Sequence, residues 1–351
     1  MERLGTGKGV AALLNGRARH VSSKAVRALE RALPDALILV SEDFEQARRH
    51  VARIVAGKPR LVLSGGGDGA IVRLLNFLRE EGAHPLPALG VLKLGTGNGW
   101  ARVCGAPDFF TLARALPLLP DPLPTRRFDL VEVEKTLCHF AGVGWDAKIL
   151  NDYSRNLDKR SAQLVGSTLA TRLHKGVVGY LYSTARITIP ELMREPQPHV
   201  SIESLEGQAY SLDARGALLP IIDAEGGAPA RKLHEGAFSI AAAGSTPEWG
   251  FGFRAFPFAQ KKPGYINLRT YDRHPLEAAR NVFKLWRGNH PQPGMTDFFV
   301  RKARLTFSRP VPFQIGGDPY GLRSTLDFSA AAEAANLVDW TAAMAETASA
   351  R

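Results

Sequence analysis

Two consecutive segments with the same internal order constrain the fold of this chain more than any other feature. Each has an apolar run of strand length, a glycine-rich turn and a helix-like pattern. The first begins at Arg60 and reads RLVLSGGGDGAIVRLLNFL, and the second begins at Leu89 and reads LGVLKLGTGNGWARVC. This order is typical of nucleotide sites in α/β proteins. Two such loops in succession predict one shared crevice.

The first loop, residues 65–69, combines glycines with one acid. The glycines can adopt positive φ and direct their N–H groups at an anion without interference from a Cβ atom, and the following helix adds the positive end of its dipole. Asp68 would repel a phosphate unless a divalent cation or a substrate hydroxyl lies between them. The loop therefore indicates phosphoryl transfer, while the alternative is that Asp68 only caps its own helix.

The second loop, residues 95–99, offers a hydroxyl at Thr96 and an amide at Asn98. Both groups suit contacts with phosphate or ribose, and both suit capping of the helix expected from Trp100 to Cys104. The two roles are compatible.

Gly66-Gly67-Asp68-Gly69 followed by Leu94-Gly95-Thr96-Gly97-Asn98 resembles the diacylglycerol kinase catalytic domain family of lipid kinases, which includes sphingosine and ceramide kinases. The ordered pair carries the resemblance, because GGDG alone also occurs in NAD kinases and phosphofructokinases. It implies transfer of the γ-phosphate of ATP to a lipid hydroxyl, of diacylglycerol or a sphingoid-type lipid, with Mg²⁺ held through water. Asp68 would be the general base or order the magnesium. The implied nucleotide-binding residues are Asn15, Ser64, Gly65, Gly66, Gly67, Gly69, Gly95, Thr96, Gly97 and Asn98.

The resemblance also assigns roles further along the chain. Asp129 matches an acidic family position, and we expect it to share magnesium with Asp68. Asp146 lies in a segment whose Asp is near the lipid headgroup in the family, and Arg155 falls where sphingosine kinases have a phosphate-contacting arginine. The alternatives are a turn residue for Asp146 and a solvated helix face for Arg155.

Two positions depart from the family pattern. Many members have Asp after the loop asparagine, where this chain has Gly99. The family's Asp-Gly-Glu, on a strand end facing the nucleotide, is here Gly316-Gly317-Asp318. We expect Asp318 to be the remaining catalytic carboxylate of that site, and the alternative is a member that has lost catalysis.

Alternating strands and helices in the first part predict a doubly wound parallel α/β domain, similar to NAD kinases and diacylglycerol kinases. From about Val177 short apolar or alternating runs dominate, which predicts a β-sandwich-like second domain. We expect a nucleotide-binding catalytic domain at residues 1–127 and a lipid-substrate domain at residues 128–327, with the site in the cleft between them. The Ala-rich end, residues 328–351, is predicted to be a helix that packs back on the first domain.

The net charge of +11 and the pI near 9.8 favour an anionic partner. Charge alone does not distinguish a membrane surface, a nucleotide and a nucleic acid, and a basic surface without a partner is the alternative. With the family resemblance, we expect a lipid substrate, peripheral binding to an anionic membrane and no nucleic acid. A homodimer stays open.

The two cysteines, Cys104 and Cys138, lack CxxC spacing and a nearby His cluster, which argues against a zinc site or a disulfide framework. The first residues lack the apolar core of a signal peptide, and no run of about 18 apolar residues occurs. We expect a cytoplasmic protein whose membrane contact is peripheral.

A dinucleotide site is an alternative, because Gly65, Gly67 and Ala70 satisfy a G-x-G-x-x-A pattern. The acid expected at the end of the next strand is missing, since that strand ends in Lys93-Leu94-Gly95. Two alternatives therefore stand beside the lipid kinase: a NAD(P)-binding or NAD-phosphorylating enzyme, and a non-catalytic lipid or nucleotide sensor.

Overall fold

The computed structural model describes residues 2–145, 147–148, 196–224, 226–249, 253–274, 277 and 292–349. The chain forms two compact units, neither of which is continuous in sequence. The first comprises residues 1–130, 246–254 and 331–351, and the second comprises residues 131–245 and 255–330. A short segment from the later half of the chain and the C-terminal residues therefore belong to the first unit.

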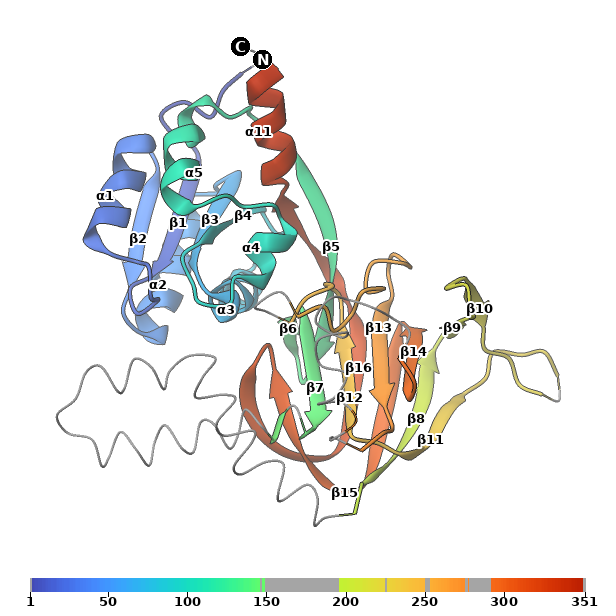
Figure 1. The fold of residues 1–351 in the computed structure, drawn as a ribbon. Coiled ribbons are helices and arrows are strands. Elements are labelled where there is room, and N and C mark those ends of the chain that lie inside the picture. Colours follow the sequence, from blue (N-terminus) through green and yellow to red (C-terminus); the bar gives the residue numbers. More distant parts are fainter. Residues whose placement is uncertain are drawn as a thin grey trace, which may run out of the picture. The chain divides into compact units, whose positions relative to one another are not determined.

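The first unit is built on four parallel strands in the order β4-β3-β1-β2, flanked by helices (Figure 1). Ala12 of β1 lies opposite Ile38 of β2 on one side and Leu63 of β3 on the other, so β1 is an interior strand. Continuous apolar runs without alternation are what strands buried on both faces require. The strands are β1 (Val10–Asn15), β2 (Leu37–Ser41), β3 (Leu61–Gly66) and β4 (Ala88–Lys93).

Side-chain caps fix where the first helices begin. The hydroxyl of Ser22 accepts a hydrogen bond from the amide of Ala25 at 3.2 Å, and Asp43 accepts from the amide of Gln46 at 2.7 Å. Helix α1 packs on α5, and α2 packs on α3. The helices are α1 (Ser23–Ala32), α2 (Phe44–Ala56), α3 (Asp68–Glu80), α4 (Gly99–Val103) and α5 (Phe109–Ala115), followed by a 3₁₀ turn, η1 (Leu116–Leu118).

The end of the chain differs from the prediction. Residues 328–351 were expected to be helical, but β16 (Asp318–Val338) continues through the Ala-rich segment, and only α11 (Trp340–Ser349) is a helix. Leu337 of β16 pairs in parallel with Leu89 of β4. Pairing in a sheet here overrides the high helix propensity of alanine. The buried Trp340 begins α11, and its Nε1–H donates to the carbonyl of Val91 at 3.0 Å.

The second unit is rich in antiparallel strands, in the order β10-β9-β14-β13-β12-β7-β15-β16, and β8 pairs with both β11 and β15. The long strand β15 pairs with β8 through Phe307 and with β7 from Phe313 onward, so it takes part in two groups of strands. Strand β5 (Thr125–Val133) runs from the first unit into the second, which begins at Val131. The other strands are β6 (Thr136–Cys138), β7 (Phe140–Gly144), β8 (His199–Glu206), β9 (Tyr210–Leu212), β10 (Leu218–Pro220), β11 (Lys232–Ala237), β12 (Ile240–Gly244), β13 (Ile266–Tyr271), β14 (Met295–Val300) and β15 (Lys302–Ile315).

The predicted fold class is confirmed: an α/β first part is followed by a strand-rich region. Among the described helices, none has the length and apolar character needed to cross a bilayer.

Candidate functional site

The first glycine loop connects β3 to α3. At Gly65 and Gly66 there is little space for a Cβ atom. Gly65 and Gly66 still pair with Leu92 and Lys93 of β4. A Cβ atom on Gly65 would lie 2.1 Å from Cδ2 of Leu14, and one on Gly66 would lie 2.6 Å from Cβ of Ala70. None of Gly65, Gly66, Gly67 and Gly69 adopts the positive φ that glycine permits. Neighbouring side chains, and not an unusual turn, leave little room for larger residues at these two positions.

The two glycine loops are in direct contact, as the sequence predicted for one shared site. A Cβ atom on Gly95 would lie 2.2 Å from Cα of Gly67 and 2.8 Å from the carbonyl oxygen of Gly66. Any side chain at position 95 would therefore push the second loop away from the first. Both loops follow the carboxyl ends of adjacent parallel strands, where open α/β sheets bind their ligands.

Asn98 and His20 hold the second loop. Asn98 adopts left-handed backbone geometry, with φ 52°. Its Oδ1 accepts from the amide of Gly95 at 2.9 Å, and its Nδ2 donates to the carbonyl of Gly95 at 2.8 Å. Nδ1 of His20 lies 3.1 Å from the same carbonyl. Because a carbonyl only accepts, Nδ1 carries the ring proton in this arrangement.

These contacts orient the peptide bond between Gly95 and Thr96. In a trans peptide the C=O and N–H groups point in opposite directions, so the amide of Thr96 points away from the side chains that bind the carbonyl of Gly95. The side chain of Thr96 is exposed at the tip of the loop. Thr96 thus offers both an amide and a hydroxyl for a ligand.

Asp68 links the two loops. Its Oδ2 accepts from the amide of Gly99 at 3.0 Å, and its Oδ1 accepts from the amide of Trp100 at 2.9 Å. The carboxylate thus caps α4, the helix that follows the other loop. The alternative that Asp68 caps its own helix is wrong, since Gly67 is the N-cap of α3 and α3 has no side-chain cap. Asn98 occupies the N-cap position of α4, but its side chain makes no capping hydrogen bond because it is bonded to Gly95 within the loop.

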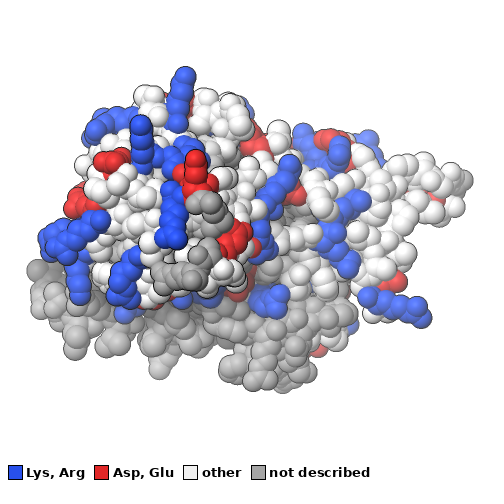
Figure 2. All heavy atoms as spheres, turned by 90° about the horizontal axis from the view of Figure 1, so that it is seen from above, with Lys and Arg blue, Asp and Glu red and all other residues white. Residues whose placement is uncertain are grey.

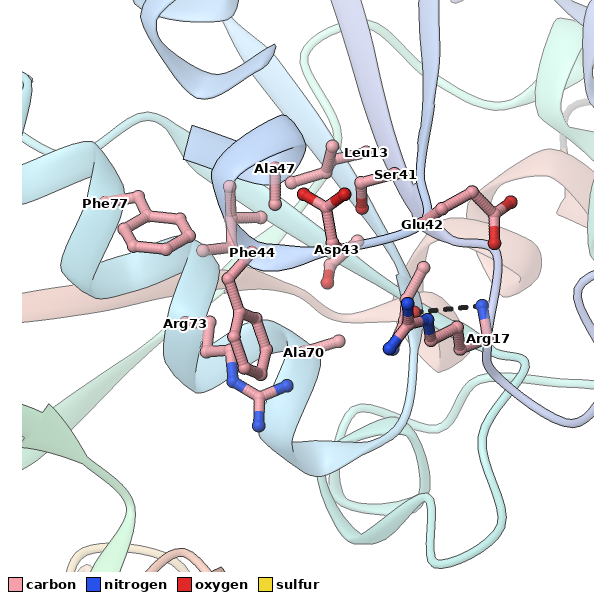
Figure 3. Close-up of a pocket in the computed structure, with 13 residues that line it drawn as sticks. Leu13, Arg17, Ser41, Glu42, Asp43, Phe44, Ala47, Ala70, Arg73 and Phe77 are labelled. Carbon is pink, nitrogen blue, oxygen red and sulfur yellow. Dashed lines mark hydrogen bonds between the residues drawn. The ribbon is translucent and has the colours of Figure 1, made fainter. Parts of the chain in front are cut away.

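A pocket of about 180 Å³ lies beside the first loop, at the carboxyl ends of β1, β2 and β3 (Figure 3). It includes two of the predicted nucleotide-binding residues, Asn15 and Ser64. Oδ1 of Asn15 accepts from the amide of Arg17 at 3.1 Å. The remaining lining residues are Leu13, Arg17, Ser41, Glu42, Asp43, Phe44, Ala47, Ala70, Arg73, Leu74 and Phe77.

Arg73 and Phe44 line the pocket, but no sequence motif marked them as candidate site residues. The guanidinium of Arg73 lies 4.2 Å from the ring centroid of Phe44, and Figure 3 shows the two side chains against each other at one side of the pocket. Phe44 is 58% exposed, which is unusual for such a large apolar side chain. Arg73 and Phe44 lie 29 residues apart on different helices, so only the fold brings them together.

The other predicted site residues divide into three groups. Asp129 lies on β5, in the first unit, where it accepts from Nη2 of Arg127 at 3.0 Å. Asp318 lies in the second unit, exposed at the start of β16 and opposite Ile315. Gly316 and Gly317 form the turn between β15 and β16, with φ 59° and 93°. Asp146 and Arg155 lie outside the described residues.

Both cysteines are free thiols in the core. Burial raises the pKa of the Cys104 thiol to about 12 and also raises the pKa of the Cys138 thiol. Since the thiolate is the reactive form, neither residue is suited to nucleophilic chemistry at neutral pH.

Comparison with known proteins supports the resemblance seen in the loops. Residues 12–132 match the family model described as the diacylglycerol kinase catalytic domain. The chain is 32% identical over 98 residues to the lipid kinase YegS of Escherichia coli strain K12, which covers 27% of this chain and 32% of that protein. It is 35% identical over 81 residues to a protein named "Probable lipid kinase YegS-like" from Enterobacter sp. strain 638, covering 23% and 26%. The aligned part thus spans about a third of these relatives or less.

A solved structure extends the likeness in fold to almost the whole chain. A diacylglycerol kinase from Bacillus anthracis strain Sterne aligns with a TM-score of 0.58 and 14% identity, covering 95% of this chain and 97% of that chain. At this identity the match shows a common fold. The resemblance to the diacylglycerol kinase catalytic domain family is confirmed for residues 12–132.

Proposed function

We propose that this chain is an ATP-dependent lipid kinase that transfers the γ-phosphate of ATP to the hydroxyl of a diacylglycerol or sphingoid-type lipid. The observation that carries the proposal is the contact between the two glycine loops, with the carboxylate of Asp68 bonded to the amides that follow the second loop. An acid held between two glycine loops suits phosphoryl transfer, where positioning and charge stabilisation do most of the work.

In this proposal the nucleotide lies along the carboxyl ends of β1 to β4. The phosphates contact the backbone of the two glycine loops, and the nucleoside occupies the pocket that Asn15, Ser64 and Phe44 help to line. Backbone amides and a helix N-terminus favour negative charge at this position. The absence of Cβ atoms in the loops lets a phosphate approach the backbone closely.

Asp68 retains the capacity to act as a base. A carboxylate has about four lone-pair positions, and two amides use two of them. A remaining position can accept the proton of the lipid hydroxyl as that oxygen bonds to the γ-phosphorus. The bond between the γ-phosphorus and the bridging oxygen then breaks, ADP leaves, and the proton passes from Asp68 to water.

Among the described residues no group of three or more His, Cys, Asp or Glu side chains gathers as a metal site, so magnesium would be held largely through water. Asp68 and Asp129 would hold it, with water molecules completing the shell, because Mg²⁺ prefers oxygen ligands and keeps several waters. When bound, the ion would neutralise charge on the phosphates. Asp129 already forms an ion pair with Arg127, so an ion bound there would share this carboxylate with the guanidinium.

Peripheral membrane binding is part of the proposal, since the substrate is a lipid and the chain carries a net charge of +11. On the face shown in Figure 2, Lys and Arg side chains are spread among acidic ones and do not form a single patch. We therefore expect binding to anionic vesicles that is weak and is lost as salt rises. Equal sedimentation with neutral and anionic vesicles at low salt would contradict the electrostatic part. The homodimer stays a prediction, to be tested by measuring the mass in solution.

A second candidate function is a non-catalytic lipid- or nucleotide-binding protein. It is favoured by the turn at Gly316 and Gly317, which offers no carboxylate where the family usually has its first acid. Asp is among the residues that tolerate left-handed geometry, so Gly316→Asp can restore the acid with little strain. We expect this variant to change turnover little, and Asp318→Ala to weaken the use of Mg-ATP. If Gly316→Asp converts an inert protein into an active kinase, the natural chain is non-catalytic.

The experiment that tests the main proposal is incubation of the protein with a total lipid extract and ATP labelled at the γ-phosphate, followed by mass spectrometry. We expect a labelled phospholipid, whose mass identifies the acceptor. A labelled dinucleotide in a parallel incubation with NAD, together with no labelled lipid, would instead support the NAD-phosphorylating alternative. Thermal stabilisation by ATP and ADP but not by NAD would separate the same two functions by binding alone.

A further inference from the structure

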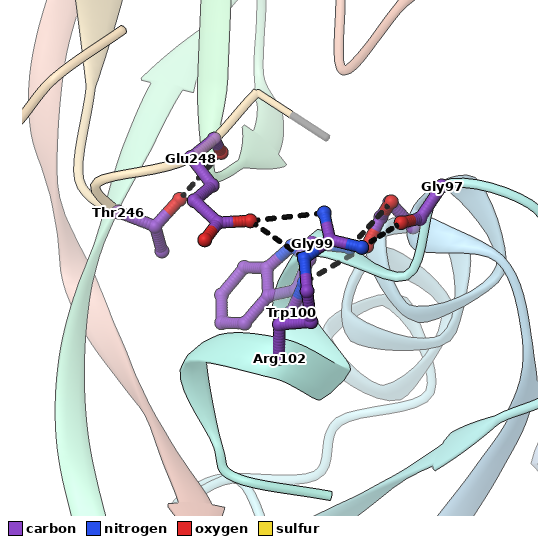
Figure 4. A network of polar contacts seen from close by, with 7 residues as sticks. Gly97, Gly99, Trp100, Arg102, Thr246 and Glu248 are labelled. Atoms are coloured by element: carbon purple, nitrogen blue, oxygen red, sulfur yellow. Dashed lines mark hydrogen bonds and ion pairs between the residues drawn. The ribbon is translucent and has the colours of Figure 1, made fainter. Parts of the chain in front are cut away.

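Arg102 connects the second glycine loop to a segment far away in sequence (Figure 4). Its Nη1 donates to the carbonyl of Gly97 at 2.6 Å. Its Nε donates to Oε2 of Glu248 at 3.0 Å, and its Nη2 lies 2.9 Å from the same oxygen. The side chains of Arg102 and Glu248 are 31% and 17% exposed, so the ion pair is partly shielded from water. One guanidinium therefore holds a loop carbonyl and a carboxylate together.

The hydrogen bond from Arg102 restrains the backbone at Gly97, which has no side chain of its own to restrain it. Gly97 has no side chain, and a Cβ atom there would lie 2.9 Å from Oδ2 of Asp68. A glycine backbone has many accessible conformations, so its peptide needs an external partner. With the carbonyl of Gly97 bound to Arg102, the amide of Asn98 points in the opposite direction.

Hydrogen bonds restrain the backbone around Glu248. It belongs to residues 246–254, which are part of the first unit although the chain before and after them belongs to the second. The hydroxyl of Thr246, a buried residue, donates to the carbonyl of Glu248 at 3.4 Å. The amide of Trp249 donates to the carbonyl of Phe253 at 3.0 Å, and the two rings lie 5.7 Å apart. With the backbone of Glu248 restrained in this way, its carboxylate can orient the guanidinium of Arg102.

We propose that Arg102 and Glu248 are positioning residues for the proposed phosphate transfer: Glu248 orients Arg102, and Arg102 sets the direction of the Gly97 peptide before the nucleotide binds. The inference rests on the proposed function, in which the backbone amides of the loops bind the phosphates of ATP. Aligning the amides in advance removes an ordering step from binding. Arginine is needed because its planar fork reaches two acceptors in fixed directions, which the single ammonium group of lysine does not.

Arg102→Lys tests the positioning role directly. We expect the dissociation constant for a magnesium complex of a non-hydrolysable ATP analogue, measured by calorimetry, to rise about tenfold, the size of one charge-assisted hydrogen bond. The melting temperature should stay within about 3 °C of the natural protein. The matched control is Arg126→Lys, since Arg126 donates to the carbonyl of Val103 at 3.2 Å, at the other end of α4. An equal loss of affinity in both variants would overturn the proposal.

A double variant tests whether the two residues act as one unit. Glu248→Gln removes the charge that orients Arg102, and we expect a loss of affinity of about threefold. Arg102→Lys/Glu248→Gln should bind no more weakly than Arg102→Lys alone. Losses that multiply in the double variant would show that Glu248 acts independently of Arg102.

Hydrogen exchange separates a failure of this inference from a failure of the proposed function. Without any ligand, amides in residues 95–100 should exchange faster in Arg102→Lys than in the natural protein or Arg126→Lys. If exchange there is unchanged, Arg102 does not hold the loop. If exchange rises but the natural protein binds no ATP analogue, the positioning contact exists and the proposed function is wrong.

Discussion

Glycine has opposite roles in two regions of this molecule, the paired loops at residues 65–69 and 95–99 and the turn at residues 316–317. In the loops, Cβ atoms on Gly65 and Gly95 would meet neighbouring atoms at 2.1 and 2.2 Å, and neither glycine has positive φ. In the turn, Gly316 and Gly317 have φ 59° and 93°, and a Cβ atom on Gly317 would meet nothing within 4 Å. Lack of space requires glycine at Gly65 and Gly95 in the loops, whereas the backbone conformation favours glycine in the turn without excluding other residues.

The difference shows where function is concentrated. A turn that requires positive φ accepts Asn or Asp at a small cost, so its glycines are replaceable. A side chain at Gly95 has no space between the two loops, which keeps the amides of both loops beside one another and beside Asp68. We therefore expect substitutions in the loops to have larger effects than substitutions in the turn.

The largest expected effect is that of Asp68→Asn on turnover. We expect a loss of at least ~10²-fold in labelled lipid product, since the variant removes the proposed base. The amide nitrogen of Asn cannot accept from a backbone N–H, so one cap bond on α4 is also lost, which lowers the free energy of unfolding by about 1 kcal/mol. The protein should still fold.

Asp108→Asn is the matched control for Asp68→Asn. Asp108 also caps a helix, because its Oδ1 accepts from the amides of Phe110 and Thr111 at 2.8 and 3.3 Å. We expect this variant to have normal turnover. Normal turnover in the folded fraction of Asp68→Asn would show that Asp68 serves only as a cap.

The next largest effect is that of Gly95→Ala on stability and nucleotide affinity. The new Cβ atom forces the loops apart, and such overpacking costs about 1–3 kcal/mol. Gly67→Ala is the counterpart on the other loop, where a Cβ atom would lie 3.8 Å from Cα of Gly95. We expect chemical denaturation to show a loss for Gly67→Ala below about 1 kcal/mol. Equal losses would mean that the loops are not in contact in solution.

A smaller effect is expected from Gly317→Ala in the turn. Left-handed geometry costs a non-glycine residue about 1–2 kcal/mol, and the less flexible unfolded chain offsets about 0.4–1 kcal/mol. The net loss in the free energy of unfolding should be about 1 kcal/mol. Gly226→Ala is the control, since it adds a Cβ atom in open space without positive φ. A loss for Gly317→Ala as large as that for Gly95→Ala would remove the distinction between the two regions.

The smallest effect concerns the ion pair of Glu134 with Arg323, which lies on the strand that follows the turn. The hydrogen bond from Arg323 lowers the pKa of Glu134 from its ordinary value of 4.5. A lowered carboxyl pKa contributes stability above the ordinary pKa, and this contribution is lost as pH falls through the folded-state pKa. The pair is largely exposed, so Glu134→Gln should cost only a few tenths of a kcal/mol at pH 7. Melting curves of variant and natural protein should converge below pH 4.

Much of the fold could be predicted from the sequence, because local patterns decide it. Helix α2 (Phe44–Ala56) is an example, since its apolar face is periodic and Asp43 stands at its N-cap. The Ala-rich end could not be predicted, because Leu337 pairs with Leu89, a residue almost 250 positions away. No local pattern records such a pairing.

The site was predictable only where a motif marks it. The glycines, Asp68 and Asn98 were identified by their motifs, but the hydrogen bonds from Gly99 and Trp100 to Asp68 depend on the packing of two loops. Arg102 and Glu248 lie 146 residues apart and match no motif. An arginine three residues after a glycine loop, and a lone acid among aromatic residues, are the only signals the sequence offers for them.

The claim that both glycine loops hold the same nucleotide can be tested most directly by hydrogen exchange of the natural protein with and without magnesium and a non-hydrolysable ATP analogue. We expect slower exchange in residues 66–70 and in residues 95–100 together, at the same ligand concentration. Slower exchange in only one loop, or in neither, would contradict a shared nucleotide site.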